Sequence, residues 1–287
     1  MANRHRPRGT WSDRLATLLF SCIALGITTL FLGILVKIVW NGAAQIDIDY
    51  LLSAPQDAGR AGGIGSILVS TGLILAVCLA VSVPLGLGSA MLLAELCLAN
   101  GRFGCAVRGS LDLLAGVPSI VIGLFGNAFF CVTLGLGFSI LSGGLTLSCM
   151  VLPILIRATE EGFRAVPDEI RLGGAALGLS RGAVLRRLLL PLALPGLLVG
   201  LVLGVGRALA ETAALIFTSG YVDRMPSSLL DSGRSLSIHI YDLSMNVPGG
   251  DQRAYAAALM LIVSLVLINR IASWASRRAL SQGIVNR

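Results

Sequence analysis

Long apolar stretches, separated by shorter charged ones, run through almost the whole chain. Each is long enough to cross the hydrocarbon core of a bilayer, which takes roughly 17–25 residues of α-helix. The pattern predicts six transmembrane helices, at about 15–40, 61–94, 113–134, 140–157, 188–219 and 254–274. The expected fold class is therefore an all-α integral membrane protein.

The uncharged stretch from Leu113 to Ile156 is the one whose division needs an argument. A single helix over this stretch would be about 66 Å long, which is enough for two crossings of a core about 30 Å thick. Four glycines lie near its middle, at Gly135, Gly137, Gly143 and Gly144. We expect the break between the third and fourth helices there.

Composition agrees with the membrane interpretation, because 55% of the residues are hydrophobic and only 13% are charged. Soluble domains are typically about 25% charged. The net charge of +7 would favour nucleic-acid binding in a soluble protein, but here the arginines cluster between apolar stretches. Cytoplasmic loops of membrane proteins are enriched in this way. We therefore expect both termini in the cytoplasm and no nucleic-acid partner.

Two regions are expected along the chain. Residues 1–60 would form a cytoplasmic tail, the first transmembrane helix and an external loop. Residues 61–287 would form the core, with five helices and a charged cytoplasmic loop at about 157–190.

The chain lacks the residues that an ATPase or a metalloenzyme needs. Its single lysine, Lys37, lies in the first apolar stretch, so no phosphate-binding loop ending in Gly-Lys-Ser/Thr exists. The six cysteines form no CxxC pair, and the two histidines are far apart in sequence. We expect no catalytic residue, no metal and no cofactor in this chain. Any ATP hydrolysis must come from a separate polypeptide.

The charged loop reads EEGFRAVPDEIRLGGAALGLSRGAVLRRLLLP from Glu160 to Pro191. Pro167 suits the first turn of a short helix, and the acids that follow it suit the positive end of the helix dipole. Gly173 and Gly174 would give this helix a smooth face that another protein can approach closely, and Gly178 would end it. A short helix of this kind between two spans is a docking element, although a solvated interfacial loop has the same composition.

This loop resembles the cytoplasmic loop of ABC-importer permeases, whose pattern is EAA, three residues, Gly, nine residues, Ile, one residue, Leu-Pro. Gly178, Leu188, Leu190 and Pro191 match those spacings, but Leu172 replaces the glutamate. Five further stretches resemble the PstA family of phosphate-importer permeases: GVPSIVIGLFG, SGGLTLSCMVLPILIRATEEGFRAVP, GRALAETAAL, SLSIHIYDL and AYAAALMLIVSLVLINRIA. The resemblance extends over most of the chain from about residue 65 onward.

The resemblance implies a type I, MetI-like permease fold in the bacterial inner membrane, and import of inorganic phosphate by alternating access. It implies three kinds of protein partner besides membrane lipid: a PstC-like second permease, two copies of a PstB-like ATPase that bind ATP and Mg, and a PstS-like periplasmic phosphate-binding protein. In such a complex the cytoplasmic loop would dock on the ATPase. The residues expected to couple to the ATPase are Pro167, Asp168, Glu169, Arg171, Gly173, Gly174, Gly178 and Pro191.

Two charges interrupt the fifth apolar stretch, and charges inside a membrane are costly and usually functional. Arg207 and Glu211 are four residues apart, which would place them on one helix face. They could neutralise each other, or Arg207 could face the pathway and offer its planar donor fork to an oxyanion. The resemblance favours the pathway role for both residues.

Arg157 and Glu160 end the fourth apolar stretch. They could form a charge cluster at the exit of the pathway, or they could be an ordinary arginine-rich flank. The residues leave two other functions open. One is a permease for another oxyanion such as sulfate, molybdate or a phosphonate, and the other is an ion-coupled secondary transporter, which would usually carry an internal repeat.

Overall fold

The structure is a computed structural model that describes residues 11–96 and 101–285. Within them, five helices are long and apolar enough to cross a membrane, and a bent pair of helices makes up to six. The prediction of an all-α membrane protein is confirmed. The five long helices are α1 (Trp11–Ala43), α3 (Gly65–Met91), α6 (Ile140–Arg164), α9 (Leu190–Ala210) and α12 (Asp251–Val285).

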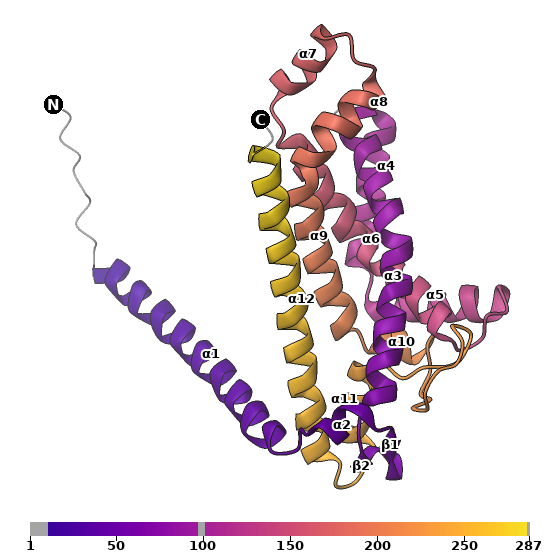
Figure 1. Cartoon of the computed structure of the whole chain (residues 1–287). Helices are drawn as coiled ribbons and strands as arrows, with labels where there is room; N and C mark the ends of the chain where they lie inside the picture. Colours follow the sequence, from indigo (N-terminus) through magenta and orange to yellow (C-terminus); the bar gives the residue numbers. More distant parts are fainter. Residues whose placement is uncertain (1–10, 97–100, 286–287) are drawn as a thin grey trace.

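Helix α6 is the centre of the bundle, packed between α3 and α9 (Figure 1). Its crossing with α9 is close, because a side chain at Gly196 would meet the Cα of Gly162 at 2.6 Å. The main apolar core joins α3, α6 and α9 through Ile74, Leu155 and Leu197. This packing fixes the backbone from which the charged residues at the C-terminal end of α6 project.

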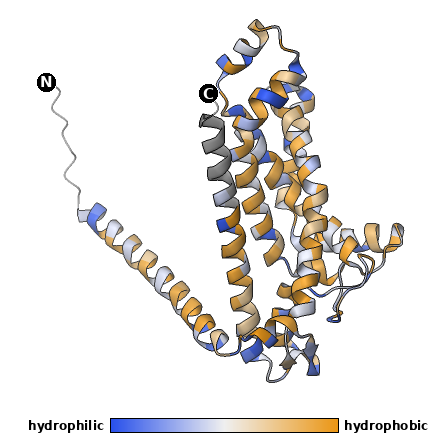
Figure 2. Cartoon of the chain, viewed as in Figure 1, coloured by the Kyte–Doolittle hydropathy of each residue, from blue (hydrophilic) through white to orange (hydrophobic). Residues whose placement is uncertain are grey.

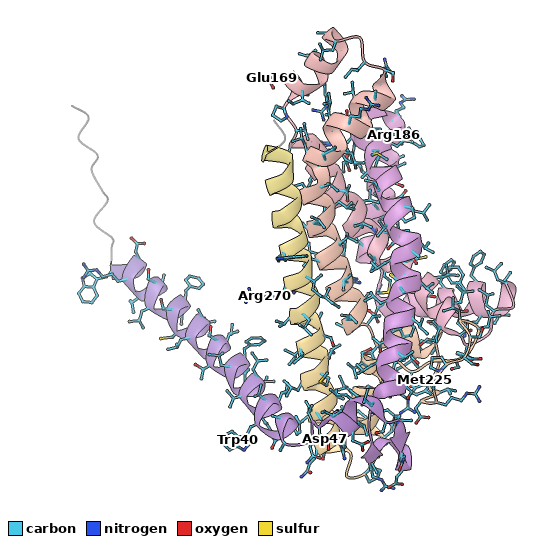
Figure 3. The ribbon with its side chains drawn as sticks, viewed as in Figure 1. Trp40, Asp47, Glu169, Arg186, Met225 and Arg270 are labelled. Atoms are coloured by element: carbon cyan, nitrogen blue, oxygen red, sulfur yellow. The ribbon has the colours of Figure 1, made fainter. Side chains whose placement is uncertain are left out.

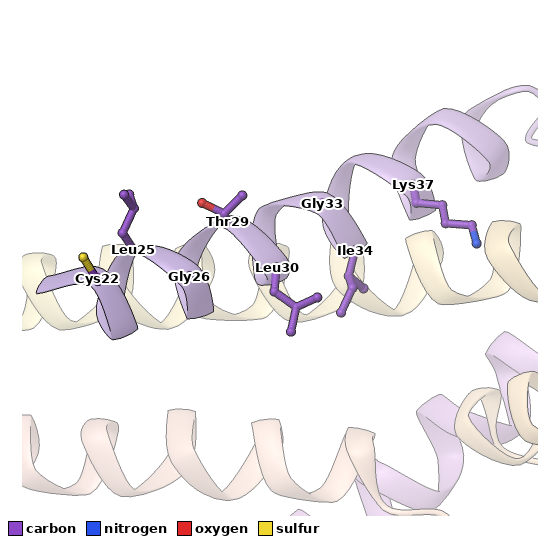
Figure 4. Close-up of a pocket in the computed structure, with 8 residues that line it drawn as sticks. All are labelled: Cys22, Leu25, Gly26, Thr29, Leu30, Gly33, Ile34 and Lys37. Atoms are coloured by element: carbon purple, nitrogen blue, oxygen red, sulfur yellow. The ribbon is translucent and has the colours of Figure 1, made fainter. Parts of the chain in front are cut away.

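Helix α1 stands apart from the bundle and approaches α12 only near its C-terminal end (Figure 1). There Gly42 lies against Tyr255, and the Lys37 ammonium is 5.7 Å from the centre of the Tyr255 ring. The rest of α1 is exposed and apolar (Figure 2). Figure 4 shows its shallow groove, from Cys22 to Lys37, in which Gly26 and Gly33 have no neighbour. Such a surface is compatible only with lipid or another protein.

The third predicted helix, 113–134, is wrong as a single straight element. Helix α4 begins earlier, at Arg102, and ends at Gly116; α5 (Ser119–Gly126) then starts at an angle of 101° to it and continues as the π-helix η3 (Asn127–Thr133). Val117 is extended, with φ −70° and ψ 130°, because Pro118 disfavours the helical conformation in the residue before it.

The fifth predicted helix, 188–219, is also interrupted. Helix α9 ends at Ala210, and the four-residue helix α10 (Ala213–Ile216) follows. The fourth predicted helix extends past its expected end at 157 to Arg164, and the sixth extends to Val285. Charged residues thus continue two helices that hydropathy alone would end.

Short elements close the bundle at both ends (Figure 1). One end, here called the α11 end, carries α11 (Leu236–Met245), α2 (Ile48–Leu52), the 3-10 helix η1 (Asp57–Gly59) and the two-stranded antiparallel sheet of β1 (Pro55–Gln56) and β2 (Ala61–Gly62). The opposite end, here called the α7 end, carries α7 (Asp168–Ala176), α8 (Arg181–Val184) and the π-helices η4 (Leu185–Leu189) and η2 (Leu92–Leu96).

Candidate functional site

The loop between α6 and α9 forms two short helices, as predicted. Pro167 caps α7, and Gly178 follows it with φ +70°, a conformation that glycine adopts without strain. Pro191 lies at the start of α9, which continues the π-helix η4 without a break. The ends of α7 therefore follow from local sequence.

The outer surface of α7 is apolar at its tip and acidic at its start. Leu172 is 68% exposed and Leu177 is 79% exposed. Gly173 has open space around it, whereas a side chain at Gly174 would meet Val184 of α8 at 2.7 Å. The predicted glycine face is thus divided, with Gly173 free for an incoming partner and Gly174 packed inside the chain. Asp168 and Glu169 are exposed at the first turn, where Figure 3 labels Glu169.

Arg171 points back into the protein instead of outward. Its guanidinium bonds Glu95 of η2 twice, with Nη2–Oε1 2.6 Å and Nε–Oε2 3.1 Å. It also donates to the backbone oxygens of Phe163 and Val166 and contacts Asp168 at 3.2 Å. The hydrogen bonds with Glu95 are the main reason that the pKa of Arg171 is raised. Arg171 is therefore held by partners within the chain, and of the two exposed acids of α7 it pairs with Asp168 and not with Glu169.

Arg157 and Glu160 belong to a larger charged cluster at the α7 end. The Glu160 side chain is only 3% exposed, and its Oε1 lies 2.8 Å from Arg108 Nε and 2.8 Å from Arg164 Nη2. Its Oε2 lies 4.0 Å from Arg157 Nη1, and Arg157 also bonds Asp112 at 2.5 Å. The structure thus brings the two predicted residues together. A buried carboxylate is tolerated here because three arginines surround it.

Sequence reasoning missed Glu95, Arg108 and Arg164 as members of these charge networks. Arg108 lies on α4 and also donates to the backbone oxygen of Leu93. The available signal was the position of all three beside apolar stretches, where unpaired charges are unfavourable. That signal does not identify their partners, which come from other helices.

The expectation that Arg207 and Glu211 share one helix face is wrong. Arg207 lies in the last turn of α9, but Glu211 follows the helix with extended backbone, φ −76° and ψ 127°. The Glu211 carboxylate accepts a hydrogen bond from the backbone N–H of Ala214, so it caps α10. Arg207 is exposed. Among the described residues, 11–96 and 101–285, it makes no hydrogen bond or ion pair. The two charges therefore do not neutralise each other.

Two broken helices meet close to these charges. A side chain at Gly123 of α5 would touch the Cα of Ala214 of α10 at 2.6 Å. The Asn127 amide also donates to the backbone oxygen of Phe217 at 2.8 Å. Interrupted helices within a bundle commonly mark the substrate path of a transporter, because they expose backbone groups and helix ends.

A second polar cluster lies at the α11 end, and sequence reasoning gave it no role. Arg234 contacts Asp242 at 3.1 Å and donates to the backbone oxygen of Tyr221 at 2.8 Å. Its Nη1 is 3.4 Å from Nδ1 of His239, which is 2% exposed. Burial, reinforced by Arg234, lowers the pKa of His239 to about 4. Within the described part of the chain, no group of His, Cys, Asp and Glu is arranged to hold a metal ion.

Residues 82–281 match the family described as "Binding-protein-dependent transport system inner membrane component". The chain is 29% identical over 278 residues to a probable ABC transporter permease, YqgI, of Bacillus subtilis, covering 92% of this chain and 94% of that protein. It is 32% identical over 263 residues to the phosphate transport system permease PstA 2 of Mycobacterium bovis, covering 90% of this chain and 86% of that protein.

A solved structure has the same fold. It is that of a bacterial alginate ABC transporter in complex with an alginate-bound periplasmic protein. The TM-score is 0.64 at 17% identity, over 93% of this chain and 97% of that one. At this identity the likeness supports the fold and not the transported substrate.

Proposed function

This chain belongs to the family of binding-protein-dependent transport system inner membrane components, and from that premise we propose that it imports phosphate. It is the permease of an ABC importer, a membrane subunit that does not itself hydrolyse ATP. The predicted function is supported by the phosphate permeases among its relatives. Phosphate is a tetrahedral oxyanion, so the site must offer hydrogen-bond donors and positive charge without holding the anion permanently.

Arg207 is the observation that carries the substrate proposal. An arginine within a membrane span costs roughly 2.5–3.5 kcal/mol on insertion scales unless it reaches water, a partner or a ligand. Arg207 lies in the candidate span Arg181–Ala210, is exposed, and has no partner within the described residues. We place it on the pathway between this chain and a second permease, where its two parallel N–H donors would hold a phosphate oxygen pair.

Glu211 would act on this site indirectly. Its carboxylate is held by the α10 backbone, and its own backbone oxygen accepts a hydrogen bond from Ser237 of α11 at 2.5 Å. In this position it adds negative charge beside the path, which would keep an anion from binding too tightly to leave. The cluster of Arg157 and Glu160 would lie at the exit.

The energy comes from the partner ATPase, which binds ATP and Mg. The α7 end is the arginine-rich one, so we assign it to the cytoplasm together with both termini. Its exposed Leu172, Gly173 and Leu177 would then enter a groove on one ATPase subunit. At the α11 end, the 221–253 segment would meet the loaded binding protein. ATP-driven closure of a PstB-like pair would rock the bundle against a PstC-like permease.

Uptake of labelled phosphate at low external concentration tests the proposal. Cells lacking this chain would be compared with cells carrying the wild type, Arg207→Ala or Arg270→Ala, each with excess unlabelled sulfate. Arg270 is a matched control, because it is also exposed within a candidate span, on α12 (Figure 3). We expect sulfate-resistant uptake that only Arg207→Ala abolishes, with the complex still assembled.

Uptake that sulfate suppresses would instead assign the chain to another oxyanion. Normal uptake by Arg207→Ala would exclude the proposed role of this residue.

A further inference from the structure

The π-helix η2 directly continues α3, so a force applied to η2 is transmitted to one of the main helices of the bundle. Glu95 lies near the end of η2 and accepts both hydrogen bonds from Arg171. A bidentate pair of this kind fixes distance and orientation together, which a single hydrogen bond does not. Short π-helical segments often occur at functional positions within α-helices.

Arg171 also binds its own helix to the end of α6. Its Nη1 donates to Val166 at 2.6 Å and its Nη2 to Phe163 at 2.9 Å. All these donors belong to one planar guanidinium, so α7, the end of α6 and the end of α3 are joined by a single rigid group. The side chains of Arg171 and Glu95 are 25% and 13% exposed. Solvent screening of the pair is therefore much weaker than at a surface ion pair.

The packing contacts that hold α7 against the bundle are apolar, unlike the ion pair of Arg171 and Glu95. A cavity of about 410 Å³ lies between α7, α8, η4 and η2, and both charged side chains line it. Gly174 of α7 packs against Val184 of α8, which also lines this cavity. Ile170 joins the apolar cluster that includes Met91 and Ala94. Apolar contacts can slide, whereas the ion pair has one geometry, so the pair sets the register between α7 and α3.

The other side of η2 is held as well. Arg108 of α4 donates to the backbone oxygen of Leu93 at 3.0 Å and bonds Glu160 of α6. The η2 segment is therefore bonded to α7 through Glu95, and to α4 through the backbone oxygen of Leu93. Arg108 of α4 in turn bonds α6 through Glu160. A displacement of α7 would thus reach α3 through Glu95, besides reaching α6 through the three residues that connect the two helices.

We propose that Glu95 and Arg171 form a coupling strut, through which movement of α7 is transmitted to α3. Glu95 is a positioning residue in this role, because it acts through Arg171 and touches neither the transported anion nor ATP. This role rests on the proposed function, because an ATPase must first move α7.

The test uses the complete transporter, with its second permease, ATPase and binding protein, in sealed vesicles. The quantity measured is the number of anions imported per ATP hydrolysed, using whichever oxyanion the wild type imports. The variants are Glu95→Gln, Arg171→Gln and the double variant. Asp57→Asn is the matched control, because Asp57 also pairs with an arginine, Arg60 at 2.8 Å, but within one short segment of the α11 end.

We expect each single variant to lower this ratio about tenfold, within the range typical of coupling between sites. The double variant should be no worse than the more affected single one, because both remove the same link. Assembly and binding-protein-stimulated ATP hydrolysis should stay near wild type, and Asp57→Asn should leave the ratio unchanged.

An unchanged ratio in Glu95→Gln would overturn the strut. Equal loss of assembly, hydrolysis and import would reduce the pair to a structural role. If the wild type imports an anion other than phosphate, the substrate proposal fails. The number of those anions imported per ATP hydrolysed still tests the coupling role of Glu95 and Arg171.

Discussion

The two ends of the molecule both concentrate charge, but they use it differently. At the α7 end, two ion pairs join elements that are far apart in the chain: Arg108 of α4 and Glu160 of α6 are 52 residues apart, and Arg171 of α7 and Glu95 of η2 are 76 residues apart. At the α11 end, Arg234 contacts His239, only 5 residues away. Pairs between helices can carry movement through the bundle, whereas pairs within a segment hold that segment in shape.

The α11 end is attached to the bundle by other means. Ser66 of α3 donates to the backbone oxygen of Asp223, and the backbone N–H of Ser139 donates to Thr218 at 3.0 Å. Neutral hydrogen bonds thus fasten the loop that precedes α11. We therefore expect that removing a charged side chain destabilises the protein most at the α7 end. At the α11 end, stability should depend mainly on pH and on side-chain packing.

Glu160→Ala should have the largest effect. It leaves Arg108 without its buried carboxylate and removes the shared partner of Arg164, and breaking a buried ion pair by removing one partner costs about 3–5 kcal/mol. The measurements are the thermal unfolding temperature and the yield of the purified complex. Glu161→Ala is the control, since Glu161 is exposed on the same helix. Equal stability of the two variants would contradict the assigned role of Glu160 in holding this end together.

Low pH should have the next largest effect, through His239. Its pKa is about 4 in the folded protein, below the ordinary 6.5. The unfolded chain therefore binds a proton at a pH where the folded chain does not, so stability falls as the pH drops from about 6.5 to 4. Between pH 6.5 and 5 this loss is about 2 kcal/mol.

Unfolding temperatures of wild type and His239→Gln at pH 7.5 and pH 5 measure this loss. The variant should lose less stability on acidification than the wild type does. If both lose the same amount, the acid sensitivity arises elsewhere, and the α11 end is not the pH-responsive end.

Gly59→Ala should destabilise the protein by about 1–3 kcal/mol through overpacking, an effect comparable with that of low pH. Gly59 has φ +89°, and a side chain there would meet Cε1 of His239 at 2.8 Å. Gly249→Ala is the matched control, because Gly249 has a similar φ of +79° but open space around it. The difference between the two unfolding temperatures isolates the contact with His239. No difference would mean that η1 moves away from α11 without cost.

The α7 region illustrates how far local sequence reasoning reaches. Pro167, Gly178 and Pro191 lie where they were predicted, because a proline or a glycine constrains its own backbone whatever surrounds it. The division between Gly173 and Gly174 was not predictable in the same way. Adjacent residues of a helix point in different directions, and which one faces α8 depends on how α7 docks.

Arg207 and Glu211 illustrate the opposite case. Their spacing favours one helix face only if the helix continues, and nothing in the apolar stretch from 188 to 219 marks an end at Ala210. The bend after Gly116 had a signal in Pro118, but the run of apolar residues on both sides favoured one span. In both places the packing of α5 against α10 accompanies the break.

The apolar pattern alone predicted that this chain is a membrane protein, about where its spans lie, and which loop carries the short helix α7. These properties depend on the length of apolar segments and on residues that restrict their own backbone, and both are local. Which charges meet depends on how the helices pack. Glu95 reaches Arg171, and Glu160 reaches Arg108, only because α3, α4 and α6 pack in one particular register. Partners so far apart in the chain are set by that packing and by no local pattern.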